Sequence, residues 1–386
     1  MTVGTTKLAK FESYQKTGIM RLAENLLAQA DIQINGNRPW DLRVYDERFF
    51  DRAVGHANLG LGESYMDGWW DCHALDEFFY RILRSRIHKQ VRGGLEDLLS
   101  VLKAKLFNLQ RPSRAFQIGK RHYDLGNDLY QCMLDQRMIY SCGYWRDAGN
   151  LDAAQEAKLD LVCRKLHLKP GMKVLDIGCG WGGTAKYMAE NHDMQVVGIT
   201  VSGQQAEFAK NNCKGLPVEI RLLDYRDVNE PFDRVISIGM FEHVGVKNYH
   251  AYMAKVRSLL SNDGLFLLHT IGSNVSVFKG DRWIERYIFP NSMLPSASQI
   301  TQAYEGLFVL EDWHNFGTDY DHTLMAWKNN FNSTWYKLRC NYSERFRRMW
   351  NYYLLSNAGA FRSRVSQLWQ ILLSPRGIIG GIRVPR

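Results

Sequence analysis

A glycine-rich stretch at residues 176–183 constrains the fold of this chain more than any other feature. It reads Asp-Ile-Gly-Cys-Gly-Trp-Gly-Gly, and residues 173–177 have the apolar character of a short buried strand. From Thr184 onward the pattern is that of a helix. Glycine permits positive φ and lets a ligand approach the backbone, and the free N–H groups at a helix N-terminus attract negative or polar groups. The stretch therefore predicts a binding site for a nucleotide-like ligand.

Two kinds of ligand fit the glycine pattern. Gly178, Gly180 and Gly183 match the dinucleotide pattern G-x-G-x-x-G, which expects an acidic residue about 20 residues later for the ribose. The second strand, 195–199, is followed by Thr-Val-Ser at 200–202 and by no carboxylate, so the dinucleotide interpretation is weakened. The pattern Asp-x-Gly-x-Gly-x-Gly instead resembles the first motif of S-adenosylmethionine (SAM) methyltransferases, although most of these also carry an acid after the second strand.

The chain around this turn alternates strands and helices. Strands are predicted at 173–177, 195–199, 218–222, 233–238 and 264–270, and helices at 151–166, 182–191, 203–213 and 249–260. Candidate late strands are 308–313 and 367–373, and helical insertions are expected within 276–306 and 321–362. Such alternation is typical of a parallel sheet with helices on both faces. We therefore predict an α/β fold of the class I SAM-dependent methyltransferase type, Rossmann-like, with a doubly wound, mostly parallel sheet.

The first part of the chain is expected to form a smaller, mostly helical domain. Apolar stripes predict helices at 17–30, 49–54, 75–87 and 95–106, with a short strand at 32–35. Residues 108–114 contain Pro112 and form the expected boundary. We therefore predict an N-terminal accessory domain over residues 1–110 and a catalytic domain over residues 111–386.

Composition and charge limit the kinds of binding partner and the cellular location that the sequence allows. The apolar runs are too short to cross a bilayer, and residues 1–15 lack the apolar centre of a signal peptide, so a cytoplasmic protein is expected. The 7 cysteines show no C-x-x-C spacing, which argues against a zinc site or a disulfide framework. The net charge is +9, and residues 328–386 hold 11 Lys or Arg against 1 acidic residue. This basic region suggests a membrane surface or nucleic acid, or a solvated face without a partner.

Two polar residues follow predicted strands of the same sheet. Glu242 comes after strand 233–238, and His269 lies at the end of strand 264–270. Because ligands bind beyond the carboxyl ends of such strands, both are expected in the same crevice as the glycine turn. A carboxylate and an imidazole can orient a proton acceptor there. A satisfied core histidine and a helix-start carboxylate remain the plainer interpretations, and Cys142 is equally a small buried apolar residue.

Several motifs occur together in one order along the chain. They are His122-Tyr123-Asp124, residues 140–145, the glycine turn, Phe241-Glu242-His243-Val244-Gly245 and His269-Thr270-Ile271-Gly272. Residues 60–70, 312–317 and 352–361 extend the set. Together they resemble the cyclopropane-fatty-acyl-phospholipid synthase family, and the resemblance covers nearly the whole chain from about residue 18.

The resemblance implies a reaction and a catalytic set. It implies transfer of a methylene from SAM to the cis double bond of an unsaturated acyl chain in a membrane phospholipid, forming a cyclopropane ring. The alkene is a poor nucleophile, so the sulfonium methyl group must be held in line with it, and aromatic rings can stabilise the resulting carbocation. The family uses bound bicarbonate as the general base. By motif, the residues that hold it are Cys142, Glu242, His269, Ile271 (through its backbone) and Tyr320.

The resemblance also implies a cofactor site. Tyr140 and Ser141 are expected to close over SAM, while Thr200 and Gln205 replace the missing ribose acid. Tyr225 and Arg226 are expected on the adenine side. The methionine and ribose site is implied for Asp176, Gly178, Cys179, Gly180, Trp181, Gly182, Gly183 and Thr184.

Other interpretations stay open at this point. One is a relative that makes methyl-branched rather than cyclopropane lipids. Another is a nucleic-acid methyltransferase, against which stand the missing N-P-P-Y motif and the missing RNA-binding module; no nucleic-acid partner is expected. A third is an inactive lipid-binding scaffold, which the intact catalytic set argues against. Relatives often carry a Cys at the position of Asn357, but an alkene attacking a sulfonium needs no covalent enzyme intermediate.

The basic region is expected to meet the membrane. Residues 328–386 interleave arginines, among them Arg345, Arg347 and Arg348, with Trp335, Trp350 and Trp369. Basic residues are attracted to anionic lipid and aromatic residues prefer the interface. We therefore predict a peripheral protein on the inner face of the membrane, acting on unsaturated phospholipids there. A homodimer is expected, since two such surfaces on one membrane would raise avidity.

Overall fold

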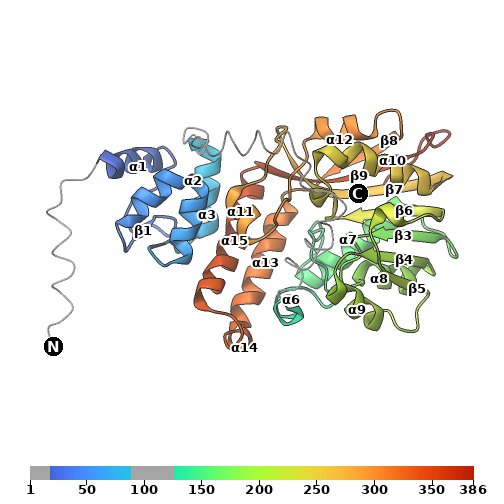
Figure 1. The fold of residues 1–386 in the computed structure, drawn as a ribbon, viewed down its shortest axis with the longest axis horizontal. Helices are drawn as coiled ribbons and strands as arrows, with labels where there is room; N and C mark the ends of the chain where they lie inside the picture. The colour runs from blue at the N-terminus through green and yellow to red at the C-terminus, as the bar shows by residue number, and fades with distance from the viewer. Residues whose placement is uncertain (1–17, 88–125) are drawn as a thin grey trace.

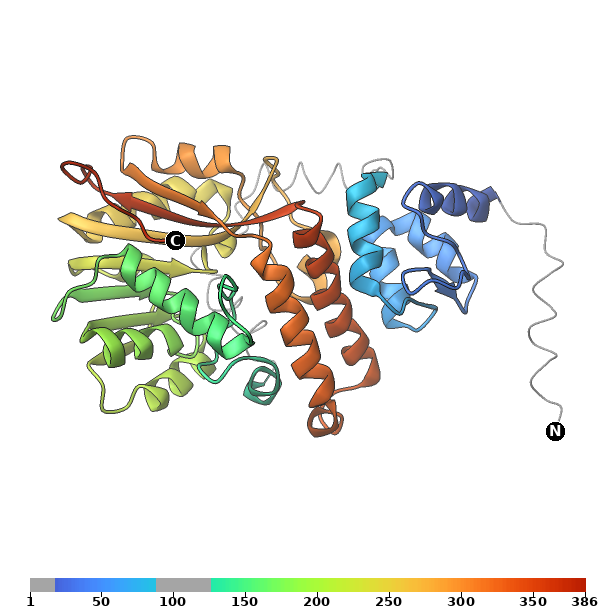
Figure 2. The ribbon, with the colours of Figure 1, turned by 180° about the vertical axis from the view of Figure 1, so that it is seen from behind.

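The computed structural model of the chain describes residues 18–87 and 126–386. Figure 1 shows the sheet and its covering helices at one end, the N-terminal helices at the other, and the long helices α13 (Asp319–Ser333) and α15 (Glu344–Arg362) between them. The view from behind in Figure 2 shows the same order. The long helices therefore connect the N-terminal part to the sheet.

The sheet has seven strands in the order β5-β4-β3-β6-β7-β9-β8. Their bounds are β3 Lys173–Ile177, β4 Gln195–Thr200, β5 Val218–Leu222, β6 Phe232–Ile238, β7 Leu260–Ser273, β8 Val309–Asn315 and β9 Ser366–Ser374. The pairs among β5, β4, β3, β6 and β7 are parallel, and β9 runs antiparallel to both of its neighbours. The chain moves outward from β3 to β5 and then returns to the other side of β3. This reversal marks the place where ligands bind in such sheets.

Helices cover both faces of the sheet, as the alternating pattern predicts. They are α7 Leu151–Lys165, α8 Gly183–His192, α9 Gly203–Asn212, α10 Tyr249–Leu259 and α12 Ala297–Tyr304. One apolar cluster joins α10 and α12 to the strands, and another joins α7 and α8 to them. Side-chain caps define several N-termini: the Asn150 side chain accepts the Ala153 N–H before α7, and Ser296 and Gln299 form a capping box at α12. The α/β prediction is confirmed, and both late strands form.

The described N-terminal part is helical, as predicted; its second helix is much longer than the predicted 49–54, and its first and third helices are slightly shorter than the predicted 17–30 and 75–87. Its elements are α1 Gly18–Ala28, β1 Arg43–Val44, α2 Arg48–Met66, β2 Trp70–Asp71 and α3 Leu75–Ser85. The first part of the motif at residues 60–70 belongs to α2, where a Cβ at Gly62 would lie only 2.3 Å from Cδ1 of Trp283. The strand predicted at 32–35 is reduced to one bridge between Ile34 and Leu42. The helix predicted at 95–106 and the domain boundary near residue 110 lie outside the described residues.

Helix α15 (Glu344–Arg362) packs directly against the N-terminal helices. A Cβ at Gly359 would lie 2.7 Å from the Asp76 carbonyl oxygen and from Cβ of Phe79, so α15 and α3 approach closely because this residue is glycine. One continuous apolar cluster contains both Trp70 of the N-terminal part and Trp350 of α15. The N-terminal helices thus share a hydrophobic core with the rest of the chain.

The structure of the basic C-terminal region, residues 328–386, differs from the membrane-contact surface predicted for it. Trp335, Trp350 and Trp369 are buried, with at most 9% of each residue exposed. Arg345 pairs with Asp67 at 2.9 Å, and Arg348 pairs with Asp71 at 3.0 Å. The residues named for membrane contact therefore do not form one free surface: the tryptophans are core, and two of the arginines bind the N-terminal part. Among the described helices, none combines the length and the apolar character needed to span a membrane.

The remaining helices join the sheet to α15. They are α6 Asn127–Met133, α11 Arg282–Tyr287, α13 Asp319–Ser333 and α14 Trp335–Leu338, with a short 3₁₀ helix, η4, at Phe241–His243. Figure 1 places α14 at the free end of the hairpin that α13 and α15 form. Asn357 of α15 donates its side-chain amide to the Tyr353 carbonyl oxygen at 2.8 Å, within its own helix.

Candidate active site

The glycine turn between β3 and α8 has the backbone that the sequence predicts. Gly178, Gly180 and Gly182 have φ angles of +86°, +55° and +83°, which glycine adopts without strain. The N–H groups of Gly178 and Cys179 donate to the Ile199 carbonyl oxygen at 2.9 and 3.0 Å. A Cβ at Gly180 would meet no atom within 4 Å. The turn is therefore anchored to β4 on one side and open at Gly180.

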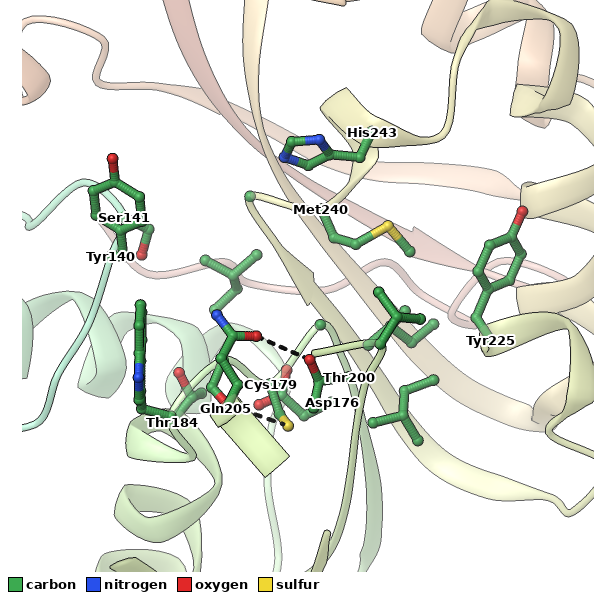
Figure 3. A pocket seen from close by; sticks show the side chains of 18 of the residues that line it. Tyr140, Ser141, Asp176, Cys179, Thr184, Thr200, Gln205, Tyr225, Met240 and His243 are labelled. Atoms are coloured by element: carbon green, nitrogen blue, oxygen red, sulfur yellow. Dashed lines mark hydrogen bonds between the residues drawn. The ribbon is translucent and has the colours of Figure 1, made fainter. Parts of the chain in front are cut away.

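A pocket opens over this turn, at the carboxyl ends of β3, β4 and β6. All of the predicted cofactor-binding residues except Gly182 line it. Gly182 instead packs toward α9, where an added Cβ would lie 3.0 Å from Cβ of Ala209. Figure 3 shows Tyr140 and Ser141 on one side of the pocket and Tyr225 on the other, with Asp176, Thr200 and Gln205 between them. Segments far apart in the sequence thus meet around one cavity.

The floor of the pocket carries polar groups that suit a cofactor with hydroxyl and ammonium groups. Thr200 Oγ1 donates to Gln205 Oε1 at 2.9 Å, and both residues are buried. Asp176 is 2% exposed, and its Oδ2 has no hydrogen-bond partner among the described residues. Burial raises the pKa of Asp176 to about 7. Because buried polar atoms are normally satisfied, this carboxyl group fits a ligand that donates a hydrogen bond to it, as the amino or ribose groups of SAM can.

Aromatic and polar side chains hold the walls of the pocket. The Tyr140 hydroxyl donates to the Tyr353 hydroxyl at 2.9 Å, which ties the closing segment to α15. On the opposite wall, Arg226 pairs with Asp224 through Nε at 2.7 Å and lies over the ring of Tyr225 at 5.2 Å. The predicted adenine-side loop is therefore pre-formed by its own contacts.

The pocket also contains residues that sequence reasoning did not assign to it. Among them are Met138, Ile139, Met240, His243, Val244 and Asn248. Met240 and His243 belong to the strand end that the sequence singled out for Glu242, and this position was the available signal. Burial lowers the pKa of His243 to about 4, so the ring is neutral near neutral pH. Figure 3 shows it above Met240 at the edge of the pocket.

Three of the five predicted catalytic residues lie together at the ends of β6 and β7. Glu242 Oε1 accepts the Ile271 N–H at 2.8 Å, while Oε2 has no hydrogen-bond partner in the described part of the chain. His269 is buried, with Nδ1 3.3 Å from Nε2 of Gln370, and its Nε2 is likewise unpartnered there. Burial raises the pKa of Glu242 to about 7 and lowers that of His269 well below its usual value. These strand ends therefore carry a neutral imidazole and a carboxyl group that can hold a proton.

Of the other two predicted catalytic residues, Cys142 contacts α13 and Tyr320 belongs to it. Cys142 Sγ lies 3.1 Å from the Gly143 carbonyl oxygen and 3.7 Å from the Thr323 hydroxyl, and burial raises the pKa of the thiol well above its usual value. Tyr320 is buried with its ring stacked on Phe361 at 4.5 Å. None of the five lines the cofactor pocket itself. They lie beside it, which differs from the expectation that Glu242 and His269 share its crevice, because the Glu242 carboxylate turns back to the β7 backbone.

Asp176 predicts a pH-dependent stability. Between about pH 4 and about pH 7 the folded carboxyl group keeps a proton that the unfolded chain has lost, so stability falls as pH rises through this window. Asp176→Asn removes the titration. Its unfolding free energy relative to wild type should grow across the window by up to roughly 4 kcal/mol, measured by urea unfolding without ligand. The same change at solvent-exposed Asp263 is the control, and a constant difference for Asp176→Asn would contradict the assignment.

The chain matches known sequences over most of its length. A family model described as mycolic acid cyclopropane synthetase matches residues 110–371. Cyclopropane-fatty-acyl-phospholipid synthase of Escherichia coli strain K12 is 56% identical over 366 residues, which cover 95% of this chain and 96% of that protein. A probable fatty acid methyltransferase of Pseudomonas putida is 40% identical over 266 residues, covering 65% of this chain and 67% of that protein.

Solved structures agree with these matches. The cyclopropane synthase MmaA2 from Mycobacterium tuberculosis superposes with a TM-score of 0.64 at 30% identity, covering 69% of this chain and 100% of that one. Mycolic acid cyclopropane synthase CmaA1, complexed with SAH and CTAB, gives 0.63 at 31% identity and covers 67% of this chain and 98% of that one. With the described sheet, these matches confirm the class I methyltransferase fold. The family model spans more than half of the chain and the Escherichia coli relative nearly all of it, so this chain is an enzyme of the cyclopropane synthase family of SAM-dependent methyltransferases.

Proposed function

We propose that this enzyme transfers a methylene from SAM to the cis double bond of unsaturated acyl chains in membrane phospholipids, forming a cyclopropane ring. The observation that carries the proposal is a SAM-type pocket beside two buried polar atoms, Glu242 Oε2 and His269 Nε2, that have no hydrogen-bond partner among the described residues. The Escherichia coli relative is named for the same substrate class. The role of the pocket is to fix the sulfonium in line with the alkene, because the alkene is a poor nucleophile.

A small anion would complete the buried polar site. Methyl transfer from SAM leaves a carbocation on the chain, and ring closure then requires the loss of one proton from the new methyl group. Bound bicarbonate would supply a base of the right size for that proton. His269 Nδ1 lies beside the Gln370 amide, so the ring proton is placed on Nε2, which can donate to an anion. Glu242, with its pKa raised to about 7, can donate as well, and the Ile271 carbonyl can accept an O–H. Cys142, which contacts Thr323 of α13, and Tyr320 of α13 would complete the set.

Aromatic rings around Tyr140 are suited to a cationic intermediate. The Tyr140 ring lies 5.2 Å from Tyr130, 5.1 Å from Trp327 and 6.3 Å from Phe289. Ring faces attract positive charge, and the attraction grows where water is excluded. Burial raises the pKa of Tyr140 well above its usual value, so its hydroxyl stays neutral and does not capture the cation as a phenolate.

The product test is direct. Purified enzyme, SAM and vesicles of phospholipid with a cis-monounsaturated chain should yield a phospholipid heavier by one CH2 group, with the upfield proton resonances of a cyclopropane ring. A product of the same mass that lacks those resonances and retains an alkene would favour the methyl-branched alternative. Absence of any transfer to phospholipid would contradict the proposed substrate.

We propose membrane contact through the tip of the hairpin between α13 and α15. Tyr336 is 64% exposed there, beside exposed Lys337 and Arg339. Unlike Arg345 and Arg348, Lys337 and Arg339 form no ion pair with the described N-terminal helices. An aromatic residue flanked by cations suits the interface of an anionic bilayer. The tip therefore replaces the larger surface predicted from the sequence as the candidate contact for peripheral binding at the inner face of the membrane.

Vesicle sedimentation tests this contact. The double change Lys337→Gln and Arg339→Gln should weaken binding to anionic vesicles by roughly 2 kcal/mol, since each basic residue near such a surface contributes about 1 kcal/mol, and added salt should reduce the difference. The matched control is Lys210→Gln with Lys214→Gln on and after α9, which removes the same charge from exposed positions elsewhere. Equal losses in the two double variants would rule out a specific role for the tip.

Two further assignments remain proposals. We propose residues 1–110 as an accessory lipid-binding region; its support is that α2 and α3 pack on α15, whose other contacts reach Tyr140 through Tyr353. We also propose a homodimer, which would present two tips to one membrane and raise avidity without new contacts. Sedimentation equilibrium of the full chain measures the second directly.

A further inference from the structure

Helix α7 carries two lysines whose side chains are completely buried, Lys158 and Lys165. Burying an ammonium group costs several kcal/mol unless partners compensate for the lost water. Lys165 has such partners on β8: its Nζ lies 3.0 Å from His314 Nδ1 and 3.6 Å from Asp312. Lys158 differs, because no carboxylate of the described chain lies within ion-pair distance of it. Its hydrogen bond goes to the Ser141 hydroxyl at 3.0 Å.

Ser141 is held by two side chains from one face of α7. Gln155, one turn before Lys158, donates its Nε2 to the Ser141 carbonyl oxygen at 2.7 Å. Lys158 holds the hydroxyl of the same residue. Gln155 and Lys158 are three residues apart, so both point in the same direction from the helix. Ser141 lines the cofactor pocket and joins Tyr140 to Cys142, so this grip sets the position of the segment expected to close over SAM.

The charge on Lys158 acts on the groups around it. Asp135 and Asp176 favour its protonated form, while burial lowers its pKa to about 8. In return, its charge lowers the pKa values of Asp176, Cys142 and His269. Asp135 is itself occupied by the N–H groups of Ile139 and Arg137. In a site without bulk water a single charge acts over longer distances than at the surface.

Asp176 is the group in the pocket on which this charge bears most directly. The thiols of Cys179 and Cys213 also face it, and burial raises the pKa of both, so they stay neutral. Lys158 is the cation that acts on Asp176 among the described residues. Without it, burial alone would push the carboxyl group further toward its protonated form.

We propose that Lys158 is a positioning residue for this reaction: it holds Ser141 at the cofactor pocket, and its buried charge acts on Asp176 in the same pocket. The inference rests on the proposed use of the pocket for SAM, but not on the lipid substrate or on bicarbonate. It follows from the full burial of the ammonium, its hydrogen bond to a pocket residue and the absence of a carboxylate within ion-pair distance among the described residues.

The test compares the two buried lysines. Lys158→Met and Lys165→Met each remove one buried ammonium from the same helix, and the dissociation constant of SAM is measured by calorimetry from about pH 6 to about pH 9. Loss of Lys158 should move the pH midpoint of SAM binding upward, so affinity falls about tenfold at the acidic end and recovers toward the basic end. Lys165→Met should leave this midpoint in place. Equal effects of the two variants at every pH would reduce Lys158 to a structural role and overturn the proposal.

Two further variants separate charge from position and guard against misfolding of Lys158→Met. Lys158→Arg keeps the charge but changes the donor geometry, so the pH midpoint should stay at the wild-type value while kcat falls. Ser141→Ala removes the hydrogen bond alone, and it should lower kcat without moving the midpoint. A shifted midpoint in Lys158→Arg would overturn the charge argument. SAM binding needs no lipid acceptor, so the dissociation constant can be measured even if the enzyme forms no cyclopropane. Failure of the proposed role of Lys158 can therefore be distinguished from failure of the proposed function.

Discussion

Replacing Gly180 by valine is expected to abolish SAM binding while the protein stays folded. The φ angle at Gly180 is +55°, and a β-branched residue there costs about 1–2 kcal/mol. No protein atom lies within 4 Å of an added Cβ, so the side chain would project into the open pocket rather than into the core. Affinity should fall by at least about 100-fold, or roughly 2.7 kcal/mol, by calorimetry with SAM.

The matched control is Gly171→Val, at the other end of β3. Gly171 has φ +84° and also has no atom within 4 Å of an added Cβ, so the backbone strain is comparable. It does not line the pocket. SAM affinity should therefore survive in Gly171→Val. Unchanged SAM binding in Gly180→Val, or tight binding of NADH by the wild type, would contradict the assignment of the pocket to SAM.

Glu242→Gln should remove most turnover and keep SAM affinity. The amide oxygen of glutamine can still accept the Ile271 N–H that Glu242 Oε1 accepts at 2.8 Å, so the fold should persist. The second oxygen, which has no partner among the described residues, becomes an NH2 group and can no longer exchange a proton. Positioned proton-transfer groups contribute about 100-fold or more to rates. We therefore expect kcat to fall by roughly 100-fold or more.

Glu311→Gln on β8 provides the comparison. Glu311 also accepts a backbone N–H, that of Ile378 at 2.9 Å, but it belongs to the edge strand and not to the ends of β6 and β7. Turnover should stay near wild type in this variant. A separate check removes bicarbonate from the buffer, which should slow the wild type and have little effect on Glu242→Gln. Full activity in Glu242→Gln, or in bicarbonate-depleted buffer, would refute the proposed role of the anion.

Local patterns predicted the sheet and the cofactor pocket because both depend on short segments. The turn from Asp176 to Gly183 follows a buried strand and opens a helix, and this sequence of elements placed it at the carboxyl edge of the sheet. Thr200 and Gln205 follow the next strand, and the structure joins them at 2.9 Å. Parallel strands bring their carboxyl ends to one edge, so residues that follow them converge without further information.

The length of α2 shows where local patterns were insufficient. Its three glycines between residues 55 and 62 disfavour a helix, since glycine costs about 1 kcal/mol in a helix interior relative to alanine. The chain is nevertheless helical on both sides of a kink at Ala57, where φ is +47°, and the helix continues to Met66. Gly62 packs against Trp283, more than two hundred residues later in the chain. Close packing of distant segments outweighed local helix propensity, and no pattern within α2 identifies Trp283 as the residue that packs against it.

The amino-acid sequence by itself determined the order of strands and helices and the glycine turn, because periodicity and turn chemistry are encoded locally, and its motifs named many but not all of the residues that edge the pocket. The fate of the charges was decided by which surfaces meet in three dimensions. Arg345 and Arg348 look like free cations in the sequence, yet they bind Asp67 and Asp71 of the N-terminal helices. Lys158 looks like a solvated helix residue, yet it is wholly buried beneath the pocket. Burial and pairing depend on contacts between segments far apart in the chain, and these arise only when the whole chain has folded.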